Sequence, residues 1–159
     1  MQITVETAVP AHAVARYYDL YRATLGPLRL HAATAHVADP ADFAAAMADV
    51  RIDKYVARQD DTLVGLATLT DDLAAMPWIE PTFYATRFRG RGAVFYLGYL
   101  LAEHDRVATE LMRAVHGRVA AARGTLGFDL AACRTGSVLG RRPVAPAPRR
   151  PRELEGAVE

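Results

Sequence analysis

The stretch KYVARQ (residues 54–59), DD (60–61) and TLVGLATLT (62–70) decides the fold class of this chain. Its two outer segments are rich in residues that favour β-strands, and the aspartates between them suit a tight turn. The stretch therefore predicts two antiparallel strands joined as a hairpin.

Three further strands are expected around this hairpin. Residues 3–7 alternate apolar and polar side chains, which predicts a first strand. Residues 93–102 form a nearly continuous apolar run of β-formers, which is typical of a strand covered on both faces. Residues 126–132 predict a last strand.

Helical patterns fill the intervals between these strands. One runs from Pro10 to Gly26, and a second begins at Pro40, where Asp39 can cap the helix. A third, the clearest, covers residues 107–123 and ends at Gly124. The apolar positions expected to face the core are Val14, Tyr17, Tyr18, Tyr21 and Leu25 in the first helix, Phe43, Met47 and Val50 in the second, and Leu111, Met112, Val115 and Val119 in the third.

Two segments carry no such periodicity. Residues 71–92 predict a long polar loop that contains Arg87, Arg89 and Arg91. Residues 134–159 are rich in proline, glycine and arginine, which predicts a disordered tail after one folded domain at 1–133.

The composition limits the classes of protein to which this chain can belong. The chain has 159 residues, 52% of them hydrophobic, and a net charge of +1, which together favour one globular domain and argue against a nucleic-acid partner. The run at 93–102 is about half of a membrane span, and the N-terminus lacks a secretory pattern. A single cysteine, Cys133, excludes an intramolecular disulfide. We expect a cytoplasmic protein that does not enter a membrane.

The order strand, helix, helix, hairpin, long strand, helix, strand resembles that of the GNAT superfamily of acyl-CoA-dependent N-acetyltransferases. The resemblance covers residues 1–133 and rests on the hairpin with Gly65, the apolar strand leading into the third helix, and the strand after it. It implies an α/β (α+β) fold with a mixed, mostly antiparallel central sheet flanked by helices, here without the family's last strands. The sheet edge this leaves would invite dimerisation.

The family holds the diphosphate of CoA on a segment that reads Arg or Gln, two residues, Gly, one residue, Gly or Ala. Arg106 matches its first position, whereas Thr109 and Leu111 replace its small residues; a register shifted by three puts Glu103 first and Ala108 last. The first register is preferred because it keeps the leading arginine. By this resemblance the cofactor-binding residues are Leu100 and Leu101, for the pantetheine arm, and Arg106, Val107, Ala108, Thr109, Glu110 and Leu111, for the pyrophosphate.

The activity implied by the resemblance is transfer of an acetyl group from acetyl-CoA to the primary amine of a small molecule or peptide. The alternative is a catalytically inactive module that keeps the fold for binding, because the glycines of the CoA segment are missing. A third interpretation is an unrelated α/β regulator that contacts DNA through its basic tail. No catalytic residue is assigned: Glu103, His104 and Asp105 are candidates for a general base, but a solvated turn and helix cap is the preferred interpretation.

Other side chains point to no separate site. The five histidines show no metal-ligand spacing, so no metal is expected. Cys133 fits a small buried residue, Tyr99 a packed core tyrosine, and Arg87, Arg89 and Arg91 either a solvated loop or a contact for CoA phosphate or an acidic partner.

Overall fold

A computed structural model describes residues 1–25, 38–77, 79–90 and 92–128. At its centre lies a five-stranded sheet with the order β1-β2-β3-β4-β5. The strands are β1 (Gln2–Glu6), β2 (Asp53–Gln59), β3 (Thr62–Thr70), β4 (Val94–Ala102) and β5 (Thr125–Phe128). Neighbours pair antiparallel from β1 to β4, whereas β4 and β5 run parallel. The expected mixed, mostly antiparallel sheet is confirmed.

The hairpin that decided the fold class is formed by β2 and β3. Its register ends at Gln59 opposite Thr62, which leaves a two-residue turn. Both turn residues have positive φ, 47° at Asp60 and 64° at Asp61. Aspartate tolerates this left-handed conformation better than most residues, and turns of this kind match the twist of paired strands.

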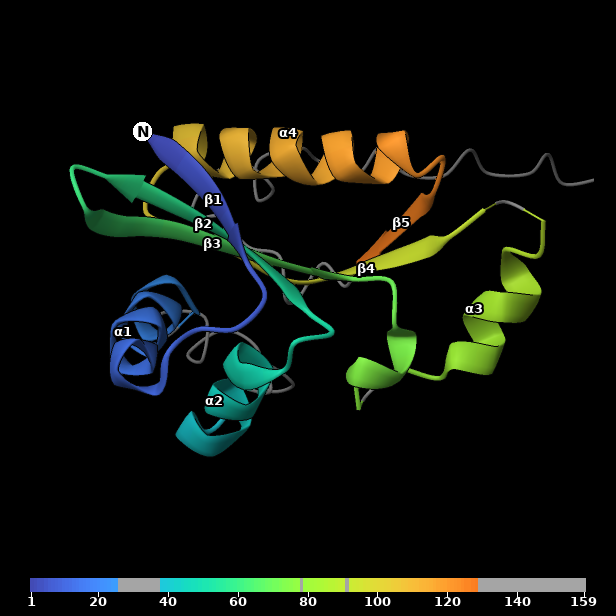
Figure 1. Cartoon of the computed structure of the whole chain (residues 1–159), viewed down its shortest axis with the longest axis horizontal. Coiled ribbons are helices and arrows are strands. Elements are labelled where there is room, and N and C mark those ends of the chain that lie inside the picture. Colours follow the sequence, from blue (N-terminus) through green and yellow to red (C-terminus); the bar gives the residue numbers. More distant parts are fainter. Residues whose placement is uncertain (26–37, 78, 91, 129–159) are drawn as a thin grey trace, which may run out of the picture.

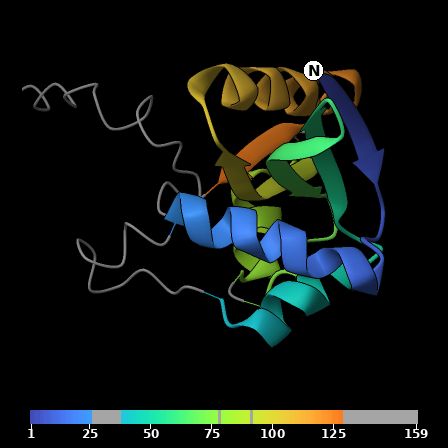
Figure 2. The same cartoon turned by 90° about the vertical axis from the view of Figure 1, so that its left-hand side faces the viewer.

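Helices cover both faces of the sheet (Figures 1 and 2). The helix α4 (Asp105–Ala121) lies along one face. On the opposite face lie α1 (Val14–Leu25), which follows the short 3₁₀ turn η1 (Ala11–Ala13), and α2 (Pro40–Ala48). The sheet is therefore buried on both sides, as the apolar run of β4 predicted.

The start of α2 follows the predicted capping pattern. The Asp39 carboxylate accepts hydrogen bonds from the backbone amides of Ala41 and Asp42, both at 2.8 Å. Phe43 and Met47 are fully buried, as expected. The placement of Val50 in the core was wrong: its side chain is 68% exposed, because the helix ends at Ala48 before another turn can carry it inward.

The helix α4 packs closely on the sheet through the expected apolar stripe. Val107, Leu111, Val115 and Val119 are buried. A Cβ atom at Gly65 of β3 would lie 2.5 Å from Val107 Cγ1, so the absence of a side chain there lets helix and strand approach. The helix begins at Asp105, two residues earlier than predicted.

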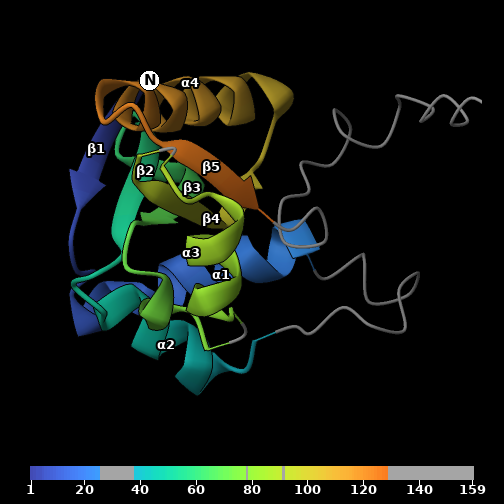
Figure 3. The same cartoon turned by 90° about the vertical axis from the view of Figure 1, so that its right-hand side faces the viewer.

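The prediction of a structureless loop at 71–92 was wrong in part. The segment contains a 3₁₀ turn, η3 (Leu73–Ala75), and a short helix, α3 (Pro81–Arg87). Proline stands at the first position of α3, and the Glu80 side chain accepts a hydrogen bond from the Thr82 amide. Tyr84 of α3 packs edge-on against Tyr96 of β4, which holds the helix beside the sheet (Figure 3).

The structure describes only the first residues of the C-terminal segment for which a last strand and a tail are predicted. The strand expected at 126–132 is described as β5 over Thr125–Phe128. Cys133, the domain boundary at 133 and the tail at 134–159 lie outside the described residues. Both the boundary and the disorder of the tail stay predictions.

Candidate functional site

An irregularity in the middle of β4 marks the candidate site. Ala67 of β3 pairs with Leu100, but Leu69 pairs with Leu97, so two residues of β4 oppose one residue of β3. This is a β-bulge, a feature found next to many active sites because it redirects a strand. Because of the extra residue, Gly98 and Tyr99 both face the side of the sheet that carries α1 and α2, where two successive strand residues would normally face opposite sides.

Thr68 of β3 lies opposite the bulge and holds it in place. Its side chain is 1% exposed, and its Oγ1 accepts a hydrogen bond of 2.8 Å from the Tyr99 amide. A Cβ atom at Gly98 would lie only 2.8 Å from that oxygen and 3.2 Å from Met76 Cε. The bulge therefore requires glycine at position 98.

The pairing between β4 and β5 is described up to the residue before the bulge. Their register runs from Val94 opposite Thr125 to Leu97 opposite Phe128. No described residue of β5 pairs with residues 98–102 of β4. The partners of the backbone amides and carbonyls on that edge of β4 are therefore described only as far as Leu97.

The N-terminus of α4, at Asp105, lies beside the same end of β4, and two residues separate it from Ala102, the last residue of the strand. The His104 carbonyl accepts hydrogen bonds from the amides of both Val107 and Ala108, so the helical bonding pattern starts there. Helix amides before that point have no carbonyl within the helix to bind, and the dipole makes this end electropositive. It is the point of the site best suited to an anion.

The structure brings together all the residues predicted to bind the cofactor, because they span the end of β4 and the first turns of α4. Their side chains nevertheless point in different directions. Leu100 and Leu101 are buried on opposite faces of the sheet, and Val107, Ala108 and Leu111 are buried under α4. Arg106 and Thr109 are exposed and Glu110 is partly exposed.

This arrangement bears on positions 109 and 111, where the family segment has small residues and this chain has Thr109 and Leu111. Leu111, which stands at a small-residue position of the family segment, is fully buried in the core cluster beneath the helix. Thr109 donates a hydrogen bond from Oγ1 to the Asp105 carbonyl, back along its own helix. Neither side chain covers the first turn of α4, so any ligand there would meet backbone amides and the Arg106 side chain.

Acidic residues surround the same helix end. Glu103 and Asp105 are exposed in the turn and first turn, and Glu110 forms an ion pair with Arg113 one turn later. The candidate bases Glu103 and His104 lie in this solvated turn, and the Glu103 amide is bonded to the Val64 carbonyl. The negative charges of Glu103 and Asp105 oppose an anionic ligand, although solvent and salt screen exposed charges.

Arg87 and Arg89 lie far from this end of the molecule. Both belong to the α3 region next to the start of β4, whereas the α4 N-terminus follows the end of β4 (Figure 1). A strand of this length spans about 25 Å. These two arginines are therefore too distant to contact a group bound at the α4 N-terminus, and their interpretation as contacts for a CoA phosphate elsewhere or for an acidic partner stays a prediction; Arg91 lies outside the described residues.

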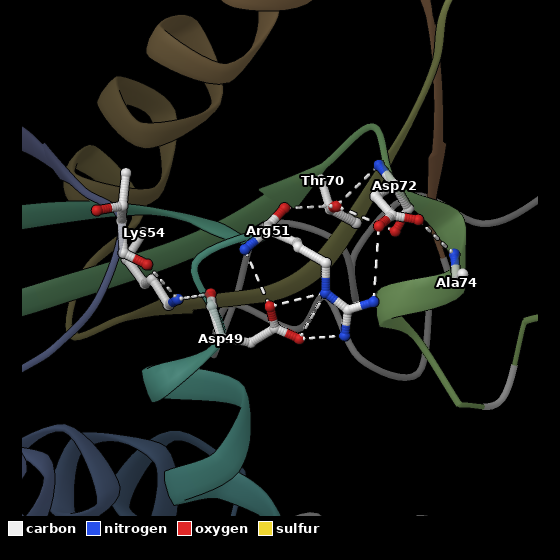
Figure 4. Close-up of polar contacts among 7 residues, drawn as sticks. Asp49, Arg51, Lys54, Thr70, Asp72 and Ala74 are labelled. Carbon is white, nitrogen blue, oxygen red and sulfur yellow. Dashed lines mark hydrogen bonds and ion pairs between the residues drawn. The ribbon is translucent and has the colours of Figure 1, made fainter.

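A second group of polar residues lies on the α1 and α2 side, near the start of β2 (Figure 4). Asp49 binds the Arg51 guanidinium, with Nη2 and Oδ2 2.6 Å apart, and Arg51 also approaches Asp72. The buried Lys54 donates from Nζ to the carbonyls of Thr7, at 2.9 Å, and Asp49, at 2.5 Å. Burial lowers the pKa of Lys54 from its ordinary 10.5 to about 8.

Sequence reasoning missed the bulge and its supporting residue Thr68. A glycine inside an otherwise apolar strand, as at Gly98, is a known sign of a bulge or of close backbone approach. That signal was present in the run at 93–102. Nothing in the sequence alone pointed to Thr68, because its role depends on the register of β3 against β4.

No group of three or more histidine, cysteine, aspartate or glutamate side chains that could hold a metal ion occurs among the described residues. Within the same residues, none of the helices has the length and apolar character needed to cross a bilayer.

The fold has counterparts among solved structures. Aminoglycoside 6′-acetyltransferase type Ii superposes with a TM-score of 0.50 at 16% sequence identity, over 78% of this chain and 67% of that enzyme. The chain has the GNAT fold. No protein-family model and no curated protein sequence matches it.

Two other solved structures are similar to a slightly lower degree. The ribosomal-protein-alanine N-acetyltransferase of Brucella melitensis biovar Abortus 2308 gives a TM-score of 0.48 at 13% identity, over 81% of this chain and 80% of that one. An integron cassette protein from the mobile metagenome of V. cholerae gives 0.47 at 15% identity, over 81% and 75%. At these identities the likeness of this GNAT-fold chain to its neighbours extends to the fold and not to the substrate.

Proposed function

We propose that this GNAT-fold chain is a cytoplasmic N-acetyltransferase that binds acetyl-CoA along residues 98–102 of β4 and transfers the acetyl group to a primary amine. The observation that carries the proposal is the coincidence of three features at one place. The bulge at Gly98, the end of β4 at Ala102 and the N-terminus of α4 at Asp105 all lie within residues 98–106.

The residues present fit an acyl-CoA thioester in two ways. Residues 98–102, with which no described residue of β5 pairs, would offer backbone donors and acceptors to the amide groups of a pantetheine arm. The start of α4, with Arg106 in its first turn, offers amides and a guanidinium to the diphosphate.

In the reaction, the amine nitrogen attacks the thioester carbonyl carbon, so that a C–N bond forms and the C–S bond breaks. The thiolate of CoA leaves, and the nitrogen gives up a proton. Backbone amides of β4 near the bulge would donate to the carbonyl oxygen as negative charge develops on it. Glu103 and His104, in the turn between β4 and α4, are the groups closest in sequence to this point that could accept the proton, directly or through water.

One feature favours a second function, that of a binding module without catalysis. The end of α4 that would hold the diphosphate carries Glu103 and Asp105, and glycine is absent from its first two turns. These acids weaken anion binding by Coulomb repulsion. Under this alternative the chain keeps the GNAT fold and binds another ligand.

Calorimetry with acetyl-CoA on the full chain distinguishes the two functions. The acetyltransferase proposal predicts micromolar binding, weakened about tenfold by Arg106→Ala because a charge-assisted contact is lost. Arg113→Ala is the matched control, since Arg113 is also exposed on α4 but pairs with Glu110. No detectable heat at millimolar acetyl-CoA would rule out the acetyltransferase and leave the binding module.

A further inference from the structure

The helix α3 presents aromatic side chains to solvent beside the sheet (Figure 3). Phe83 is 60% exposed, Tyr84 and Phe88 are partly exposed, and no residue of the helix is buried. A single exposed aromatic residue is common on protein surfaces and indicates little. Here, however, the rings are continuous. The centroids of Phe83 and Tyr84 lie 5.4 Å apart, and those of Tyr84 and Phe88 lie 6.2 Å apart.

Contacts with the sheet hold this helix in place. Tyr84 packs edge-on against the buried Tyr96 of β4, with ring centroids 6.3 Å apart. A Cβ atom at Gly127 of β5 would lie 3.3 Å from Tyr84 Cε1, so the backbone of β5 lies close to the same ring. Because Tyr84 makes these contacts, Phe83 is presented on a fixed backbone. A fixed backbone lowers the entropy cost of binding a partner.

Two arginines lie beside these rings. Arg87 stands one helical turn after Phe83, and Arg89 follows the end of the helix; both are exposed. Neither forms an ion pair with any residue that the structure describes. Within the described residues 79–90 the only acid is Glu80, which accepts a hydrogen bond from the Thr82 amide at the opposite end of the helix. The end of α3 that carries the arginines is therefore positively charged.

We propose that this surface docks an acidic segment of another protein. We call it the α3 surface, and it consists of Phe83, Tyr84, Arg87, Phe88 and Arg89. Aromatic and arginine side chains are enriched where protein partners bind. An apolar side chain of the segment would cover Phe83, and its carboxylates would pair with the arginines. This inference goes beyond the proposed acetyltransferase function and does not depend on it.

The spacing of Phe83 and Arg87 restricts the sequence of the segment. Residues four apart in an α-helix lie on one face, about 6 Å apart along the axis. In an extended segment, side chains two residues apart share a face and lie about 6.6 Å apart. An apolar anchor followed two residues later by an acid therefore fits both groups. An acid directly after the anchor would point to the opposite side.

Single-stranded nucleic acid, which is also anionic, fits the α3 surface less well. Its binding relies on many phosphate contacts along a basic groove. The α3 surface offers two arginines, and the whole chain has a net charge of only +1. A protein segment needs few ion pairs around an apolar anchor, so it is the favoured partner.

The test measures the binding of labelled peptides to the full chain by fluorescence anisotropy. The peptide Phe-Ser-Glu-Ser-Glu, blocked at both ends, has the expected spacing of anchor and acids. Phe-Glu-Ser-Glu-Ser has the same composition with the acids on the other side, and Phe-Ser-Lys-Ser-Lys reverses the charge. We expect the first peptide to bind below millimolar concentration and less tightly as salt is added. The second should bind about fivefold more weakly, and the third should not bind.

Two variants locate the binding on the α3 surface. Phe83→Ala should weaken it about tenfold through loss of the apolar contact, and Arg87→Ala up to about fivefold, the range of an exposed ion pair. Val50→Ala, which changes another exposed apolar residue, and Arg16→Ala, which changes an exposed arginine of α1, are the matched controls and should have no effect. All four side chains are exposed, so the variants should unfold at nearly the temperature of the unsubstituted protein.

Four results would overturn the inference. They are no binding of the first peptide at millimolar concentration, equal affinity for the two glutamate peptides, an unchanged dissociation constant for Phe83→Ala, and tighter binding of single-stranded decathymidylate than of the first peptide. Because the titration contains no acetyl-CoA, its outcome is separate from that of the calorimetry. A failure here refutes the docking surface and leaves the acetyltransferase proposal as it was.

Discussion

The two faces of the sheet differ in the kinds of side chain that they bury. The face under α4 is apolar: Leu111 and Val115 of the helix are fully buried against strand residues such as Ala67 and Leu97. The face under α1 and α2 holds all three buried polar side chains of the described residues, which are Lys54, Thr68 and Thr70. It also holds Tyr17, Tyr21 and Tyr99.

Each of these buried polar groups has a defined partner. Lys54 donates to the carbonyls of Thr7 and Asp49, Thr68 accepts from the Tyr99 amide, and Thr70 donates to the Arg51 carbonyl. A buried polar group costs free energy unless it is hydrogen-bonded, so these partners are necessary for stability. The difference indicates that the α4 face stabilises the fold, while the opposite face shapes the backbone around the candidate site.

The largest expected effect lies on the apolar face. Leu111→Ala should lower the free energy of unfolding by about 2 to 5 kcal/mol, because it removes a fully buried side chain and leaves a cavity. Thr109→Ala, two residues away on the exposed side of α4, should change it by less than about 0.5 kcal/mol. Urea denaturation of both variants measures the difference, and similar losses would show that α4 does not face the sheet as described.

A smaller effect, dependent on pH, is expected from Lys54 on the polar face. Its pKa is about 8 in the fold and 10.5 ordinarily, so between these values the unfolded chain binds the extra proton. The free energy of unfolding should therefore rise from pH 8 towards pH 10, by about 2 kcal/mol. Above pH 10 the raised pKa values of Tyr17, Tyr55 and Tyr99 act in the opposite direction, because tyrosines of the unfolded chain lose their protons first.

The variant Lys54→Met isolates that contribution, because Lys54 is the only lysine in the chain. Chemical denaturation at several pH values should show a flatter rise from pH 8 to pH 10 than in the unsubstituted protein, whatever the absolute stability of the variant. An unchanged slope would mean that the ammonium is not desolvated in the fold.

The smallest expected effect concerns the bulge. Thr68→Val keeps the shape of the side chain but leaves the buried amide of Tyr99 without its acceptor, which should cost about 1 to 2 kcal/mol. The same change should weaken acetyl-CoA binding, since the edge of β4 would be less firmly held. Thr62→Val, at the exposed start of β3, is the control, and equal denaturation midpoints for the two variants would contradict the role of Thr68.

Sequence patterns predicted the parts of the fold that depend on local chemistry. The aspartate turn at 60–61, the Asp39 cap and the apolar stripe of α4 all have residue types that act over one or two turns of chain, and all were confirmed. Val50 was misplaced because the helical periodicity continued past the residue where α2 ends. The helix α3 was missed because its short sequence is stabilised by Tyr84 against Tyr96, a contact between separate elements.

The position of the candidate site was inferred from the resemblance and stays a prediction, whereas its geometry comes from the structure alone. The resemblance placed it at the junction of β4 and α4, and the structure brings those residues together there. The bulge was not predicted, because it depends on how two strands align. The opposite orientations of Leu111 and Arg106 also require the true start of the helix, which lies at Asp105.

The most direct test of the account is hydrogen exchange of the full chain with and without acetyl-CoA. Residues 95–97 of β4 are paired with β5, and residues 98–106 include the end of β4, with which no described residue of β5 pairs, and the start of α4. We predict that acetyl-CoA slows amide exchange over residues 98–106 and leaves residues 95–97 unchanged. Exchange over residues 98–106 that stays the same at saturating acetyl-CoA, or slowing confined to another part of the chain, would contradict the account.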